Sequence, residues 1–210
     1  YLLDYPIGRY AAQKEDSLFL LTSSAEGYAD DCIIELDRSS GEIRKKCMLE
    51  ALIGDKYKTN GNWIVASGMQ YVQGQLILTM RRYHTVISID WEKQSVNWVL
   101  APESIWRGTV LEDKLLASDS QDRMDGYMPE SPDIYVQEDG QLRIRLYCIQ
   151  NKGNVPAEGA VSDDDSRIDF YEIDPEKHTF HKRRSVAVVK SQRDAGCVYR
   201  DQEDRILSLS

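Results

Sequence analysis

Arg81 is the residue whose type and place in this chain best suit chemistry, because it ends an alternating, strand-like segment, Gln75–Arg81. A guanidinium group can bind a sulfate, a phosphate or a carboxylate through two parallel hydrogen bonds. An arginine on an inner strand is costly to bury unless an anion accompanies it. We therefore expect around Arg81 either an anion-binding site or an internal ion pair with an aspartate or glutamate.

The other reactive side chains do not have the spacing of a known catalytic set. His84 lies in a predicted turn, and His178 and His181 belong to the basic segment KHTFHKRR, which we expect at the surface. The carboxylates of 30–31 and 163–165 are typical of solvated loops. No histidine pair and no C-x-x-C spacing suits a metal ion, so we expect neither a metal nor a cofactor.

The elements that must position Arg81 follow from the segment Asn62 to Trp106, which has the pattern of four short strands. Alternation of apolar and polar residues, as in TVISIDW, is typical of half-buried strands, and Gln73-Gly74 supplies a turn. The predicted strands of this unit are 68–72, 75–81, 85–91 and 96–100. The same order recurs on both sides, with further predicted strands at 18–21, 32–37, 42–48, 134–136, 142–148, 168–174, 198–199 and 205–209.

The order repeats along the whole chain. An apolar residue of the second strand recurs at Leu18, Leu76, Leu142 and Ile206, and the intervals are 76−18 = 58, 142−76 = 66 and 206−142 = 64 residues. Repetition of four short antiparallel strands predicts an all-β fold, the β-propeller. This chain would hold about three and a half blades, at roughly 10–54, 62–101, 132–189 and 196–210. An open propeller exposes an edge strand, so we expect further blades or a second copy to close it.

The composition excludes several kinds of partner. The net charge of −9 argues against nucleic acid and anionic membranes, and 41% hydrophobic residues is normal for a globular chain. No apolar run reaches the roughly 18 residues of a membrane span. No signal-peptide pattern opens the chain, which leaves the compartment undetermined. The polar and acidic segment 151–165 is predicted to be a loop.

Two of the four cysteines have a notable spacing. A turn at 38–41 pairs Asp37 with Glu42, and because 37 + 42 and 32 + 47 are both 79, the same register places Cys32 opposite Cys47. Such a pair is close enough for a cross-strand disulfide if it is not a hydrogen-bonded pair. The other interpretation is that both are buried small hydrophobic residues. We expect Cys148 and Cys197 to be core residues of successive blades.

The central segment resembles the bacterial arylsulfotransferases. The residues that carry the resemblance are Asn62-Trp63, Tyr71, the strand ILTMR at 77–81, the strand VISID at 86–90 and the strand WVL at 98–100, with weaker matches at 32–42 and 166–175. The resemblance implies part of a six-bladed propeller, often periplasmic or secreted, that transfers a sulfuryl group from an aryl sulfate to a phenol independently of the nucleotide donor PAPS.

The departures from the family pattern fall on the catalytic histidines. Val65 stands where the family has its nucleophilic histidine, and Ser67-Gly68 stands for the following Asn-Ser. Ser131-Pro132 replaces a Gln-His pair, and the segment 8–12 lacks the family's early histidine. Arg81 alone matches a catalytic position of the family. Covalent sulfuryl transfer needs an imidazole or an equivalent nucleophile, which valine does not supply.

The resemblance and the propeller geometry together predict a site at the mouth of the channel, where first strands begin. The predicted binding residues are Asn62, Trp63, Ser67, Arg82, Tyr83, Ser131 and Asp133, beside Arg81; Arg9, Tyr10, Arg193 and Asp194 are further positions to test. Trp63 alternatively packs between blades. Two functions follow from different classes. One is an arylsulfotransferase-like enzyme with weak, altered or absent activity, and the other is a non-catalytic propeller that binds an anionic small molecule or a protein.

Overall fold

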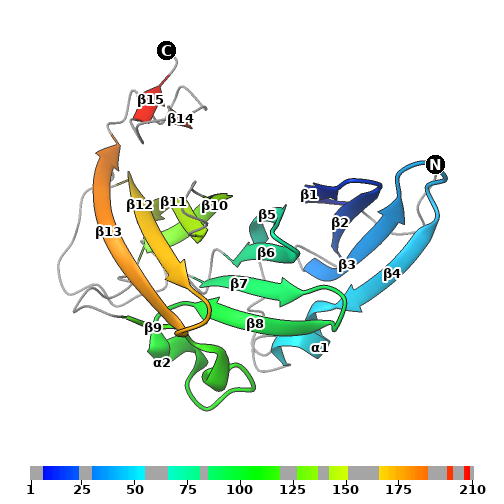
Figure 1. Ribbon diagram of the computed structural model, residues 1–210, viewed down its shortest axis with the longest axis horizontal. Helices are drawn as coiled ribbons and strands as arrows, with labels where there is room; N and C mark the ends of the chain where they lie inside the picture. The colour runs from blue at the N-terminus through cyan, green and yellow to red at the C-terminus, as the bar shows by residue number, and fades with distance from the viewer. Residues whose placement is uncertain are drawn as a thin grey trace.

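Three four-stranded antiparallel units make up most of the chain in the computed structural model (Figure 1). The structure describes residues 7–23, 30–54, 66–80, 85–118, 127–136, 142–150, 166–188, 198–200 and 206–208. The first sheet contains β1 (Ile7–Lys14), β2 (Ser17–Ser23), β3 (Asp30–Asp37) and β4 (Ile43–Met48). The second contains β5 (Ala66–Val72), β6 (Gln75–Met80), β7 (Thr85–Asp90) and β8 (Ser95–Leu100).

The third sheet contains five strands, because a short extra strand joins its outer edge. Its members are β10 (Tyr127–Val136), β11 (Leu142–Gln150), β12 (Ser166–Asp174), β13 (Thr179–Val188) and β9 (Ala117–Ser118). A two-stranded unit follows, made of β14 (Val198–Arg200) and β15 (Ile206–Ser208). The short helices are α1 (Leu49–Ile53) and α2 (Glu103–Trp106), with a 3₁₀ turn at Glu112–Lys114.

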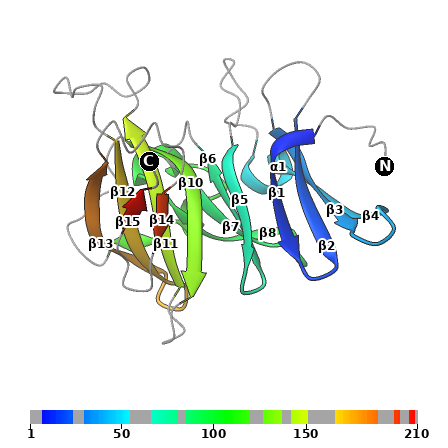
Figure 2. The same cartoon turned by 90° about the horizontal axis from the view of Figure 1, so that it is seen from above.

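The sheets are arranged as the blades of a propeller. The first strands β1, β5 and β10 lie side by side, with β5 in contact with both of the others, and the fourth strands β4, β8 and β13 lie on the outer side (Figures 1 and 2). In each of these three sheets the four main strands run in chain order from the first strand outward, and β9 is added at the outer edge of the third. The chain therefore has the predicted all-β propeller fold, with four-stranded antiparallel blades.

Apolar side chains fill the spaces between neighbouring sheets. Leu21 and Ile33 of the first sheet share a buried cluster with Leu78 and Ile87 of the second. On the opposite face of the second sheet, Trp98 and other residues pack against Ile144, Tyr171 and their neighbours in the third. Since successive side chains of a strand point to opposite faces, the second sheet must be apolar on both. Consistent with this, Leu76, Ile77 and Leu78 of β6 are all fully buried.

The segment that connects the second and third sheets forms backbone hydrogen bonds to both sheets. The Leu116 amide donates to the carbonyl oxygen of Val99 in β8 at 2.8 Å, and the Ala117 amide donates to the carbonyl oxygen of His178 at 3.1 Å. Residues Ala117–Ser118 then pair in parallel with β13. The sequence pattern did not predict this strand. His178 itself is half-buried, and the Nε2 atom of its imidazole is shielded from solvent. The expectation that His178 is a surface residue was therefore wrong for this side of its imidazole ring.

An aspartate closes the third strand of each sheet and caps the turn after it. The Asp37 carboxylate accepts the amide of Ser40 at 2.9 Å, and Asp90 and Asp174 each accept the amide three residues later at 3.0 Å. Hydrogen bonds within these turns, together with neighbouring cations, hold the pKa of all three carboxyl groups below the usual value. The repeated Ile-Asp or Leu-Asp pair at the end of the third strand, at 36–37, 89–90 and 173–174, is therefore a repeated turn cap.

These lowered pKa values predict an acid dependence of stability. The native carboxylates bind fewer protons than the unfolded ones, so their stabilisation is complete above the unfolded pKa of about 4 and is lost as the pH falls below it. We expect Asp37→Asn, which keeps the oxygen that accepts the turn amides, to flatten the decline in unfolding free energy between about pH 5 and pH 3. Urea unfolding across this range checks the slope, with the exposed Glu42→Gln as control. An unchanged slope for Asp37→Asn would contradict the assignment.

The register of the β3–β4 hairpin corrects the predicted cysteine pair. Near the turn Leu36 pairs with Ile43, as the sequence predicted, but the register shifts between Glu35 and Leu36. Cys32 consequently pairs with Met48, and Cys47 pairs with Ile33. Paired residues share a face of the sheet, so the two cysteines point to opposite faces. Both thiols are free and buried, which confirms the interpretation as small hydrophobic residues.

Candidate functional site

All three first strands are irregular near the end at which they begin. The register of β1 against β2 shifts between Ile7 and Ala11, and that of β10 against β11 shifts between Pro129 and Ser131. In β5 the shift falls between Ala66 and Gly68, so Ser67 is an extra residue without its own partner in β6. Bulges of this kind are over-represented beside active sites, where they redirect side chains. The beginnings of β1, β5 and β10 are therefore the candidate site.

The pair Ala66–Met80 ends the described ladder between β5 and β6. Both side chains are buried, and just inside the pair the Thr79 hydroxyl donates to the carbonyl oxygen of Gly68 at 3.3 Å. This bond gives the bulged backbone around Ser67 a buried polar contact. In the sequence, Val65 directly precedes this pair and Arg81 directly follows it. Val65 and Arg81, the positions that match the family's nucleophile and arginine in the resemblance, are thus the sequence neighbours of the paired residues Ala66 and Met80.

On the other side of β6, the pair Met80–Thr85 begins the ladder with β7. Thr85 is fully buried, and its hydroxyl oxygen accepts the indole N–H of Trp106, from helix α2, at 2.9 Å. Trp106 is also fully buried in the core between the first and second sheets. The sequence pattern alone did not identify this contact, because its two residues lie in different elements with no repeated spacing.

The predicted site residues fall partly within the described structure. Ser67 lies at the bulge of β5, and Ser131 and Asp133 lie in β10, where they pair with Tyr147 and Arg145. The remaining predicted residues lie outside the described residues: Asn62, Trp63, Arg81, Arg82 and Tyr83, with Arg193 and Asp194. Of the further positions, Arg9 and Tyr10 lie in β1, and Tyr10 packs against the core between the first two sheets.

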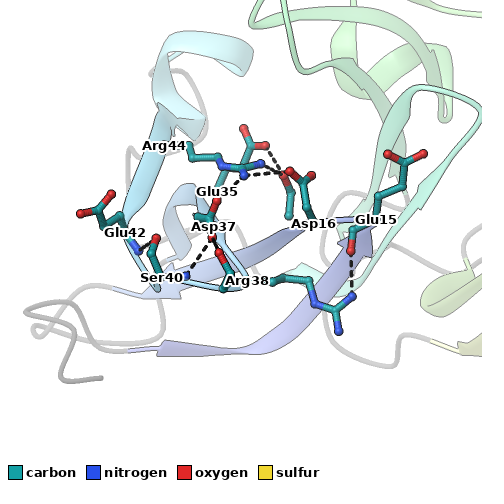
Figure 3. A network of polar contacts seen from close by, with 10 residues as sticks. Glu15, Asp16, Glu35, Asp37, Arg38, Ser40, Glu42 and Arg44 are labelled. Carbon is teal, nitrogen blue, oxygen red and sulfur yellow. Dashed lines mark hydrogen bonds and ion pairs between the residues drawn. The ribbon is translucent and has the colours of Figure 1, made fainter.

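A second polar cluster occupies the opposite end of the sheets, near the β1–β2 turn (Figure 3). The buried Glu35 carboxylate accepts the Ser17 hydroxyl at 2.7 Å and the indole N–H of Trp91 at 2.5 Å. Arg44 donates to Ser17 and to Asp16, both at 2.8 Å. The guanidinium of Arg44 lowers the pKa of Asp16, and the two aspartates bound to Arg44 raise its own pKa. Glu35 and Asp16 both accept hydrogen bonds from within the network, which joins the first and second sheets and is a structural connection.

The described residues include no candidate metal site. No three of their histidine, cysteine, aspartate and glutamate side chains are placed to hold a metal ion together. None of the helices in the described part of the chain has the length and apolarity that crossing a bilayer requires.

A comparison with models of protein families identifies the family to which this propeller belongs. The family model described as Arylsulfotransferase (ASST) matches residues 8–188, and the chain belongs to the arylsulfotransferase family. The match includes β1, β5 and β10 with their irregular beginnings. It confirms the resemblance inferred from the strands around Arg81.

Solved structures with partial likeness come from diverse proteins, whereas no curated protein matches the sequence. A glutaminyl cyclase from Myxococcus xanthus shares 10% identity, covering 89% of this chain and 55% of its own, with a TM-score of 0.41. Sqt1 of Saccharomyces cerevisiae shares 6% identity over 90% of this chain and 38% of its own, with a TM-score of 0.44. Kuenenia stuttgartiensis hydrazine synthase shares 10% identity over 90% and 51%, with a TM-score of 0.43. The chain spans less than two thirds of each of these proteins.

Proposed function

We propose that this chain binds aryl sulfates at the mouth formed where β1, β5 and β10 begin, with Arg81 holding the sulfate group. The observation that carries the proposal is the bulge at Ser67, beside the pair Ala66–Met80. Val65 and Arg81 adjoin this pair in the sequence, and they match the family's nucleophile and catalytic arginine. The other predicted binding residues are Asn62, Trp63, Arg82, Tyr83, Ser131 and Asp133.

The chemistry of position 65 limits what this site can do with a bound aryl sulfate. Transfer through a covalent intermediate forms a bond between an imidazole nitrogen and sulfur, while the bond between sulfur and the phenolic oxygen breaks. Valine has no lone pair with which to form that bond. We therefore propose a site that recognises aryl sulfates and transfers the sulfuryl group weakly or not at all. Closure of the propeller by further blades or by a second copy is a separate proposal, which the site does not require.

Arg81→Ala is the variant that tests anion recognition. We expect it to weaken binding of 4-nitrophenyl sulfate by about tenfold or more, because a bidentate, charge-assisted contact is lost. Isothermal titration calorimetry of the longest natural chain measures the change. Arg38→Ala is the matched control, since Arg38 is exposed and donates to the carbonyl oxygen of Glu15 in a turn far from the mouth. Equal affinities of the wild type and Arg81→Ala would overturn the role of Arg81.

A turnover assay separates binding from transfer. With 4-nitrophenyl sulfate as donor and phenol as acceptor, we expect no phenol-dependent release of nitrophenol above the uncatalysed rate. Release that requires phenol and disappears in Arg81→Ala would instead establish a transferase with a nucleophile other than residue 65. Absence of both binding and release by the folded wild-type protein would refute an aryl sulfate site.

A further inference from the structure

The turn between β7 and β8 of the second sheet contacts β4, the outermost main strand of the first sheet (Figure 1). The side-chain amide of Gln94 donates to the carbonyl oxygen of Lys46 at 2.8 Å. In the other direction, the ammonium group of Lys45 donates to the carbonyl oxygens of Trp91 and Glu92, both at 2.9 Å. The same ammonium lies 3.6 Å from the Glu92 carboxylate and 5.8 Å from the centre of the Trp91 ring. The turn and the strand thus each donate to the backbone of the other.

Gln94 makes its contact from a backbone conformation that disfavours glutamine. Its φ is 50°, in the left-handed region, which is costly for a residue with a Cβ atom and favours glycine. The corresponding residue of the β3–β4 turn, also four residues after the capping aspartate, is Gly41, with a φ of 75°. Unfavourable backbone conformations persist where surrounding contacts hold them. The hydrogen bond from Gln94 to Lys46 is such a contact, and glycine cannot form it.

The outermost main strands of the other two sheets are held in a different way. Val99 of β8 forms a parallel bridge to Leu115, and β13 pairs in parallel with β9. Both contacts come from the segment that connects the second and third sheets. Among the described strands, β4 pairs with β3 alone. The contacts of the β7–β8 turn therefore join β4 to the neighbouring sheet through side chains, without strand pairing.

We propose that the β7–β8 turn is a latch, which holds the outer side of the first sheet to the second. In this device Gln94 occupies a position suited to glycine because its amide binds β4, and Lys45 binds the turn from the opposite direction. The latch limits the local opening of β4, because each opening must break these hydrogen bonds. It does not depend on the proposed anion site.

Hydrogen exchange of the β4 amides, followed by mass spectrometry, tests the latch. Gln94→Gly removes the amide while favouring the left-handed conformation, and Lys45→Met removes the ammonium group while keeping the apolar stem. We expect exchange in β4 to become about threefold faster or more in each variant. Lys93→Ala is the matched control, because Lys93 is exposed and its ion pair with Asp90 lies within the second sheet. The control should stay within about twofold of the wild type.

The Gln94→Gly variant separates the latch from a role confined to the turn. If Gln94 served the turn alone, glycine would fit the backbone better and exchange in β4 would be unchanged or slower. Either of those results refutes the latch. Strand β12 of the third sheet should keep its wild-type exchange rate in every variant. Equally faster exchange in β12 and β4 would show a general loss of stability and would also refute the proposal.

Discussion

Replacement of Phe19 by alanine is expected to lower the free energy of unfolding by about 3–5 kcal/mol. Phe19 is fully buried on β2, and its ring stacks on Tyr71 of the second sheet with the centroids 5.3 Å apart. The same ring meets Trp91 edge to face, also at 5.3 Å. The truncation removes both aromatic contacts and leaves a cavity in the buried cluster between the first and second sheets, which the surrounding side chains fill only in part.

Urea unfolding followed by tryptophan fluorescence measures this loss. The matched control is Ile43→Ala on β4, because Ile43 is a large apolar residue that is 48% exposed. We expect the control to change the free energy of unfolding by less than about 0.5 kcal/mol. A loss below about 1 kcal/mol for Phe19→Ala would show that the aromatic cluster does not join the two sheets energetically.

Glu35→Ala is expected to cost about 2–4 kcal/mol, the second largest loss. The carboxylate is buried in β3 and accepts hydrogen bonds from Ser17 and from the indole of Trp91, which lies 56 residues away in the chain. Without Glu35, the indole N–H stays buried and loses its acceptor. Arg44 also contacts Ser17, so its neighbourhood loses a negative charge as well.

A double-mutant cycle isolates the bond between the two sheets. Glu35→Ala and Trp91→Phe are measured singly and together by urea unfolding, and we expect a coupling energy of about 1–3 kcal/mol. Glu42→Ala, an exposed glutamate in the adjacent turn, is the control and should couple to Trp91→Phe by no more than about 0.3 kcal/mol. Additive effects of Glu35→Ala and Trp91→Phe would mean that the hydrogen bond contributes nothing to the association of the sheets.

The strands were predictable from sequence because their alternation and turn residues are local signals. TVISID and its counterparts in β3 and β12 end in the aspartate that caps each turn, so both the strand and its end are encoded by adjacent residues. β1 was not predicted as a strand, since IGRYAAQK combines weak alternation with glycine and small residues. β9 was not predicted either, because a two-residue strand has no periodicity to detect.

The residues of the proposed site come from the sequence, whereas the contacts of the described residues around it could not be predicted. The resemblance of Arg81 and its strand to the family motif predicts a site at the mouth of the propeller, and Arg81 itself lies outside the described residues. The register shifts beside Ser67 and Ser131 depend on how two strands pair, which a single strand's sequence does not specify. The bond from Trp106 to Thr85 joins an outer helix to a blade, so only the folded arrangement brings the two residues together.

The parallel pairing of β9 with β13 has a consequence for how the molecule assembles. The four main strands of each sheet follow one another closely in the chain, so each blade can form from local hairpins. The pairing of Ala117 with Thr179, in contrast, joins two residues that lie far apart in the chain. Closing such a long loop is entropically costly, which makes distant pairings late steps of folding. Until then the edge of β13 is open to strands of other molecules. The second blade holds the segment before β9 through the bond from Leu116 to Val99, so we expect it to present Ala117–Ser118 to the Thr179–Phe180 end of this edge.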